Sequence, residues 1–172
     1  MKRISWGKDW TVSINGGEEQ AVTLPHDAMQ QLGRDKDSAA AHAGAYYRSG
    51  VYTYRKKFVP PADWSESEVI LEIEGVYPNG KVLLNGTELG KCSYGYLEYR
   101  FPMYGLTAGR ENTLEVIVDH SRTPDSRWYS GGGLYRPVSL LIGNKSHIAP
   151  GGIKIKTVDY REGLIEVSVD YV

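Results

Sequence analysis

With 172 residues, the chain has room for one full domain, or for one domain and a fragment of a second. An apolar fraction of 41% supports a real core, whereas 20 basic against 21 acidic residues leave a formal charge of −1, which disfavours nucleic acids and anionic membranes as partners. One cysteine, Cys92, excludes an internal disulfide, and neither a signal peptide nor the ~20 apolar residues of a membrane helix can be found, so we expect a soluble, cytoplasmic protein.

Helical signal is poor, and the early part of the chain predicts strands instead. Only Ala28–Leu32 resembles a turn of helix. Gly50–Phe58 predicts a long, tyrosine-rich strand that ends before two prolines. In the next strand, Val69, Leu71 and Ile73 face one way and Glu72 and Glu74 the other, so we expect both glutamates on the solvent face.

The middle of the chain predicts a hairpin and further strands. Val82–Leu84 and Thr87–Leu89 flank Asn85-Gly86, a dipeptide that tolerates the positive φ angles of a type I′ turn. The strands expected after it are Leu97–Phe101, Leu114–Asp119 and Val138–Ile142. Strands separated by turns, without alternating helices, favour an all-β antiparallel sandwich.

The C-terminal segment is expected to leave this sandwich. Gly143–Gly152 is rich in glycine and polar residues and is interpreted as a linker. Two strands, Ile153–Val158 and Leu164–Tyr171, follow it. Because a hairpin alone is marginally stable in water, we expect it to begin a second, truncated β domain. The predicted domains are therefore 1–145 and 146–172.

No catalytic residue, metal ligand or cofactor is predicted. Glu18-Glu19 are adjacent in a turn and Glu72 with Glu74 is expected in solvent, whereas a glycosidase needs two carboxylates that face each other. The four histidines are scattered, and one cysteine cannot complete a thiolate set. Ser130 lacks the strand-to-helix turn of a nucleophile elbow, and no helix follows Gly131–Gly133 to bind phosphate.

The stretch from Asp125 to Leu140 has the composition of a binding loop. Aromatic faces stack on sugar C–H surfaces, while Asp and Arg side chains reach hydroxyls. The candidate substrate-binding residues are Asp125, Arg127, Trp128 and Tyr129, and a second, weaker cluster is Tyr46-Tyr47-Arg48. Structural alternatives remain open: Trp128 and Tyr135 can plug the end of the sandwich, Arg136 can pair with a carboxylate, and Asp125 can bond Arg127.

Five ordered motifs extend over nearly the whole chain. They are LPHDAM (24–29), SGVYTYRKKFVPPADW (49–64), VILEIEGVYPNGKVLLNGTELGKCSYGYLEYRF (69–101), GRENTLEVIVDH (109–120) and SRWYSGGGLYRPVSL (126–140). Together they resemble the N-terminal sugar-binding domain of glycoside hydrolase family 2, the family of β-galactosidases, β-glucuronidases and β-mannosidases.

The resemblance implies a jelly-roll, galactose-binding-like sandwich, followed by the first strands of an immunoglobulin-like sandwich. The catalytic barrel of the family, with its two glutamates, comes later in the chain. The resemblance thus implies that the parent is a retaining glycosidase that acts on β-galactosides, and a homo-oligomer whose sugar substrate is shared with the barrel. The piece itself is expected to be inactive.

The resemblance also assigns candidate roles to individual residues. Some relatives place a substrate-contacting aspartate six residues before the last glycine of the final motif, and this position is Arg127 here. We expect Arg127 and Tyr129 to face the cleft and Trp128 to anchor the loop. Further candidates for loop anchoring or a domain interface are His26, Asp27, Tyr135 and Arg136.

Three functions remain open at this stage. The chain is the non-catalytic region of a family 2 glycosidase, a stand-alone carbohydrate-binding module, or a purely structural domain that supports the barrel and the oligomer. The sequence does not separate galactoside from glucuronide or mannoside specificity.

Overall fold

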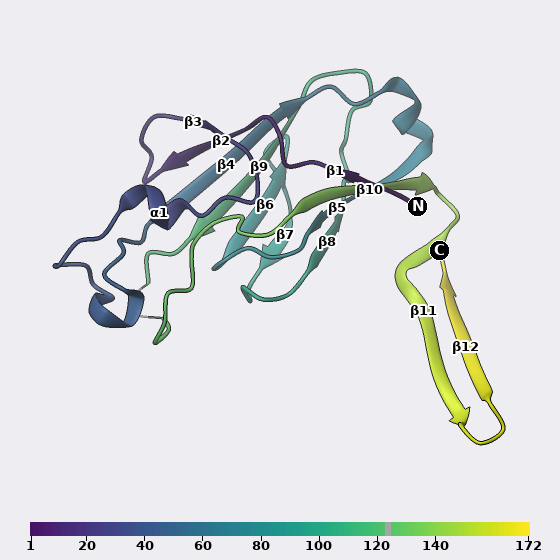
Figure 1. The fold of residues 1–172 in the computed structure, drawn as a ribbon. Helices are drawn as coiled ribbons and strands as arrows, with labels where there is room; N and C mark the ends of the chain where they lie inside the picture. The colour runs from purple at the N-terminus through teal and green to yellow at the C-terminus, as the bar shows by residue number, and fades with distance from the viewer. Residues whose placement is uncertain (123–124) are drawn as a thin grey trace.

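The computed structural model describes residues 1–122 and 125–172, and it consists of β-strands with little helix (Figure 1). A six-stranded sheet and a four-stranded sheet form a sandwich, and a two-stranded hairpin extends away from it. All strand pairs are antiparallel. The predicted all-β antiparallel sandwich is therefore confirmed.

The larger sheet has the strand order β3-β2-β4-β9-β6-β7. Its strands are β2 (Trp10–Ile14), β3 (Gln20–Val22), β4 (Val51–Phe58), β6 (Gly80–Leu84), β7 (Thr87–Cys92) and β9 (Asn112–Asp119). Burial alternates along β4, β6 and β9, because successive side chains point to opposite faces and only one face meets the core. Between β6 and β7, Asn85 and Gly86 have φ angles of 51° and 79°, as expected for the predicted turn.

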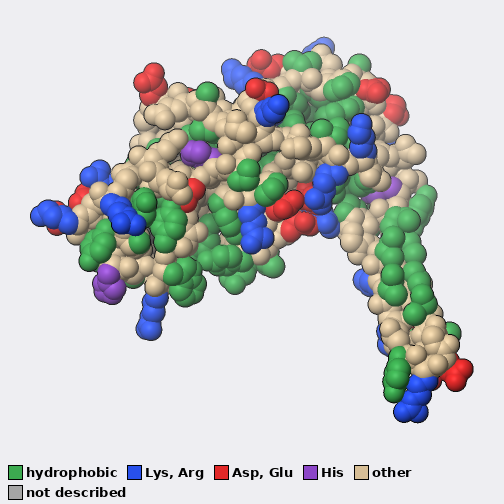
Figure 2. All heavy atoms as spheres, viewed as in Figure 1, with side chains coloured by type: hydrophobic (Ala, Val, Ile, Leu, Met, Phe, Trp, Pro, Cys, Tyr) green, Lys and Arg blue, Asp and Glu red, His purple; other side chains and the backbone are tan. Residues whose placement is uncertain are grey.

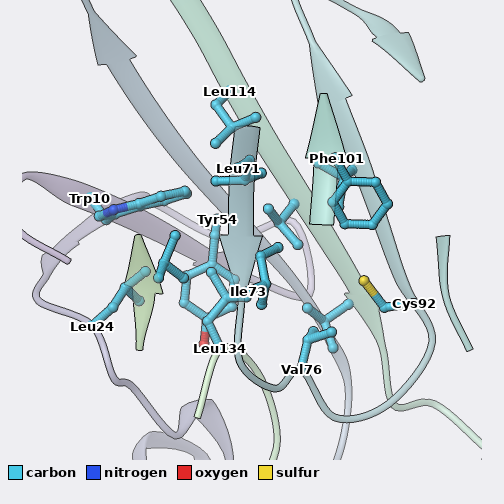
Figure 3. Close-up of a cluster of buried hydrophobic side chains, with 14 of the residues drawn as sticks. Trp10, Leu24, Tyr54, Leu71, Ile73, Val76, Cys92, Phe101, Leu114 and Leu134 are labelled. Atoms are coloured by element: carbon cyan, nitrogen blue, oxygen red, sulfur yellow. The ribbon is translucent and has the colours of Figure 1, made fainter. Parts of the chain in front are cut away.

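The smaller sheet has the order β1-β10-β5-β8. Its strands are β1 (Lys2–Ser5), β5 (Ser67–Ile73), β8 (Tyr99–Pro102) and β10 (Val138–Asn144). Side chains of both sheets meet in the core, where Trp10 and Tyr54 of the larger sheet pack in one cluster with Leu71 and Ile73 of β5 (Figure 3).

Glu72 corrects the expectation of a solvated glutamate pair. It lies on the outer face of β5 yet is fully buried, whereas Glu74 keeps 31% side-chain exposure. β5 is an inner strand, and arginines on both sides of it cover the carboxylate: Arg100 on β8 at 2.9 Å and Arg3 on β1 at 2.5 Å. Alternation showed which face Glu72 occupies, but not that two long side chains would close over it.

Three short helical segments interrupt the strands. The α-helix α1 (Ala28–Leu32) coincides with the predicted turn of helix, and Asp27 caps its first turn by accepting a hydrogen bond from the Met29 amide. Two 3₁₀ turns occupy Ala41–Gly44 and Ala62–Glu66.

The C-terminal hairpin comprises β11 (Ile148–Asp159) and β12 (Leu164–Tyr171). The linker between β10 and β11 is shorter than the predicted Gly143–Gly152, because β10 continues to Asn144 and β11 starts at Ile148. Opposed pairs such as Ile153 with Val169 and Ile155 with Val167 place apolar side chains on one face of the hairpin, and Figure 2 shows them as an exposed apolar stripe. The hairpin is present as predicted, while its membership in a second domain stays a prediction.

Candidate functional site

The loop that connects β9 to β10 is fastened to the start of α1, at the end of the sandwich away from the hairpin (Figure 1). The carboxylate of Asp27 is the fastening point. One of its oxygens accepts hydrogen bonds from the amides of Met29 and Gly132, at 3.1 and 3.0 Å, and the other accepts the hydroxyl of Tyr129 at 2.5 Å. Asp27 therefore anchors the loop, one of the two roles suggested for it from the sequence.

Backbone hydrogen bonds connect the glycine stretch to the start of α1 and to Tyr77. The amide of Ala28 donates to the carbonyl of Gly132 at 2.7 Å, and Gly133 exchanges two hydrogen bonds with Tyr77. Gly133 has a φ angle of +111°, and a Cβ there would overlap the buried hydroxyl of Tyr54. Because an L side chain rarely adopts this φ and finds no space, glycine is required at this position.

The positions of Trp128 and Tyr129 are the reverse of those predicted: Trp128 is exposed and Tyr129 anchors the loop. Trp128 was predicted to anchor the loop, but its side chain is 60% exposed. Tyr129 was predicted to face the cleft, but it is half-buried, bonds Asp27 and packs on Tyr47 with ring centroids 4.7 Å apart. Which of these two neighbouring side chains is buried depends on the path of the loop, and the sequence does not specify that path.

The other sequence candidates are spread around the loop. His26 lies under it, with Nδ1 2.9 Å from the Tyr54 hydroxyl, and Tyr135 donates its hydroxyl to the carbonyl of Gly95 at 2.6 Å. The guanidinium of Arg136 lies 5.6 Å from the Tyr135 ring centroid, and among the described residues it forms no ion pair, contrary to the favoured pairing with a carboxylate. Arg127 is exposed.

A pocket of about 770 Å³ opens on the outer side of the loop. Two segments distant in the sequence form its walls together with the loop: Tyr77–Asn79 and Ser93–Tyr96. Asp125 and Trp128 of the predicted site line it, whereas Arg127 and Tyr129 do not. The structure therefore brings together half of the candidate substrate-binding residues and separates the rest.

The polar side chains of Tyr77 and Asp125, which line the pocket, both lie close to buried His120. Oδ2 of Asp125 lies 3.0 Å from Nε2 of buried His120, although their orientation does not make a hydrogen bond. Asp125 thus contacts His120, whereas a bond with Arg127 was one of the alternatives left open by the sequence. Burial lowers the pKa of His120, so its imidazole is neutral near pH 7, and burial beside the Asp125 carboxylate raises the pKa of Tyr77 to about 12. Asp125 is thus the one anionic acceptor among these three groups.

Aromatic rings line the pocket mouth. Tyr96 lies at the centre, with ring centroids 5.6 Å from both Tyr77 and Tyr94. The indole nitrogen of Trp128 donates to the Tyr96 hydroxyl at 3.3 Å. Tyr94, Tyr96 and Trp128 are each between 41% and 60% exposed, so the rings are presented to solvent rather than used as core. Sequence reasoning missed Tyr77, Tyr94 and Tyr96; the closely spaced aromatics of Tyr94-Gly95-Tyr96 were the signal that could have indicated them.

Four glutamates of the two main sheets and their loops are paired with arginines. Glu19 and Glu115 share Arg55, and Glu72 and Glu98 share Arg100. The Arg55 and Thr11 hydrogen bonds lower the pKa of Glu19, the opposite of what a catalytic acid needs. In residues 1–122 and 125–172, no group of three or more His, Cys, Asp or Glu side chains is placed to hold a metal ion.

An antiparallel β-sandwich with an aromatic, solvent-open pocket beside its loops has the architecture of a carbohydrate-binding domain. The sequence family described as "Glycosyl hydrolase 2 galactose-binding domain-like" matches residues 10–128. The chain therefore belongs to glycoside hydrolase family 2, as the five motifs indicated.

Relatives of known description agree with this assignment. The chain is 31% identical over 160 residues to a protein of Formosa agariphila assigned as a β-glucuronidase, covering 92% of this chain and 16% of that protein. It is 30% identical over 187 residues to a β-galactosidase of Bacteroides ovatus, covering 99% and 22%. The chain thus spans about a fifth of the length of these relatives.

A solved structure shows the same fold. A β-glycosidase from Bacteroides vulgatus superposes with a TM-score of 0.88 at 29% identity, over 99% of this chain and 24% of that one. Within the part of the chain that the structure describes, no helix has the length and apolar content to cross a bilayer.

Proposed function

We propose that this chain is the non-catalytic N-terminal region of a family 2 retaining glycosidase, and that the complete enzyme hydrolyses β-galactosides. The family match over residues 10–128 carries the proposal. The engaged carboxylates support the non-catalytic role, because a retaining mechanism needs two carboxyl groups about 5–5.5 Å apart, one with a raised pKa. The proposal includes the cytoplasmic, homo-oligomeric parent expected from the sequence.

The choice of β-galactosides is supported by the Bacteroides ovatus β-galactosidase, which aligns with 99% of this chain at 30% identity. The decisive experiment expresses the complete reading frame and compares kcat/KM for 4-nitrophenyl β-galactoside, β-glucuronide and β-mannoside. We expect the galactoside to be the best substrate and the 172-residue chain alone to be inactive. A preference for the glucuronide overturns the substrate, and hydrolysis by the 172-residue chain overturns the non-catalytic role.

The exposed guanidinium of Arg127 gives a second test within the complete enzyme. If the loop contributes to the substrate site, Arg127→Ala raises KM for the galactoside and leaves the fold intact. If the region only supports the barrel, both kcat and KM are unchanged. Arg110→Ala, which changes an exposed arginine in the turn before β9, is the matched control.

A further inference from the structure

Arg100 of β8 connects the smaller sheet to the start of the C-terminal hairpin, which extends away from the sandwich (Figure 1). Nε of its guanidinium donates to Oε2 of Glu72 at 2.9 Å, Nη2 lies 2.6 Å from Oε1 of Glu98, and Nη1 donates to the carbonyl of Pro150 at 2.9 Å. Glu72 lies in β5, whereas Pro150 lies in β11. In residues 1–122 and 125–172, the bond to Pro150 is the one hydrogen bond that joins a strand of the sandwich to the hairpin.

An irregularity in β11 makes the Pro150 carbonyl accessible to this bond. The strand register shifts between Ile148 and Ile153, so that residues 149–152 bulge out of the pairing with β12. A bulge of this kind bends the strand and takes backbone groups out of the ladder. The carbonyl of Pro150 can therefore accept a hydrogen bond from Arg100 in place of a bond within the hairpin.

The other contacts between the sandwich and the hairpin are weaker. Lys145, which precedes β11, lies 3.5 Å from Glu66, but both side chains are largely exposed, and ion pairs in solvent contribute little. Met1 and Leu141 of the sandwich and Ile148 of the hairpin line a hollow of about 280 Å³, so apolar packing across the junction is incomplete. The guanidinium contact is thus the strongest directional link between the two parts.

Glu72 holds the guanidinium in place. Its carboxylate is fully buried on an inner strand, and hydrogen bonds between charged groups are about twice as strong as those between neutral ones. Because the guanidinium of Arg100 is planar and rigid, fixing one part of it on Glu72 also fixes the direction of Nη1. The ammonium group of a lysine is a single point of charge and cannot serve both acceptors in this way.

We propose that Arg100 is a clamp that fixes the direction of the hairpin relative to the sandwich, with the buried Glu72 carboxylate as its anchor and the Pro150 carbonyl as the group that it holds. This role uses contacts within the chain alone, so it is independent of the proposed function.

The clamp acts at the base of the hairpin, where the chain also returns. Val172 exchanges two backbone hydrogen bonds with His147, so the end of the hairpin is held beside its beginning. In a complete enzyme, the direction of this base sets the angle between the sandwich, with its loop of residues 125–136, and the segments that follow the hairpin.

Residual dipolar couplings of the isotope-labelled 172-residue chain in an aligned medium test the proposal. In the parent, we expect one alignment tensor to fit the amides of both the sandwich and the hairpin. Arg100→Lys keeps a cation beside Glu72 but loses the second donor. We expect it to reduce the alignment of the hairpin to about 60% or less of that of the sandwich, a loss of order typical of a flexible segment.

Arg3→Met is the matched control. It also removes a guanidinium from Glu72, but the carboxylates that Arg3 contacts, those of Glu72 and Glu74, both lie in the sandwich. We therefore expect the single tensor of the parent to persist in this variant.

Three results overturn the clamp. The first is a parent whose sandwich and hairpin need tensors of different magnitude, because the junction is then not fixed. The second is Arg100→Lys with the single tensor of the parent, because other contacts then determine the direction. The third is an equal loss of hairpin alignment in Arg3→Met and Arg100→Lys, because the disturbed Glu72 would then explain both.

Discussion

Replacing Gly133 with alanine should destabilise the sandwich strongly, although the change adds one methyl group. The residue has a φ angle of +111°, and holding an L residue in such a region costs about 1–3 kcal/mol. The added Cβ would also overlap the hydroxyl of Tyr54, whose side chain is fully buried and bonded to His26. Overpacking of this kind costs about 1–3 kcal/mol more, so we expect a total loss of about 2–6 kcal/mol.

Urea unfolding followed by tryptophan fluorescence measures this loss, with Gly86→Ala as the matched control. Gly86 also has a positive φ, +79°, but a Cβ there meets no atom within 4 Å, so this variant reports the backbone cost alone. We expect Gly133→Ala to lower the free energy of unfolding by at least about 1 kcal/mol more than Gly86→Ala. Equal losses would refute the steric argument, because the contact with Tyr54 would then add nothing to the backbone cost.

Further predictions concern the buried charges and the loop anchor. Arg100→Met should lower the free energy of unfolding by about 2 kcal/mol in urea, because it leaves the fully buried Glu72 with Arg3 alone; an unchanged midpoint contradicts this account. Tyr129→Phe should cost about 2 kcal/mol by removing the hydrogen bond to the Asp27 carboxylate, whereas Tyr104→Phe at an exposed ring should cost nothing measurable. Burial lowers the pKa of His120 below its unfolded value of about 6.5, so the unfolded chain binds the proton first, and stability falls as pH drops below about 6.5. His120→Gln should reduce the fall in melting temperature between pH 7 and pH 5, and an identical fall in both proteins would exclude His120 as its source.

Much of the fold could be predicted because its signals are local. The strand Gly50–Phe58 and the turn at Asn85-Gly86 depend on alternation and on φ preferences that a few neighbouring residues express. The strands β1, β2 and β3 near the N-terminus were not predicted, since they are short and are stabilised by partners far along the chain, β10 for β1 and β4 for β2.

The candidate site was predicted in part for the same reason. The loop 125–136 could be recognised from its composition, and Asp125 and Trp128 do line the pocket. The other walls come from Tyr77 and from the segment of Tyr94 and Tyr96, which approach the loop only when β6 and β7 pair beside β9 in the larger sheet. No spacing in the sequence indicates that contact.

The fold class and the family could be determined from the sequence alone, because alternation, turn preferences and ordered motifs are properties of neighbouring residues. Only the tertiary structure decided which groups are buried and which are presented. Glu72 is fully buried because Arg3 of β1 and Arg100 of β8 cover it, and Trp128 is exposed because Asp27 holds its neighbour Tyr129 inward. Exposure depends on what packs from elsewhere in the chain, and this information is absent from any single stretch of residues.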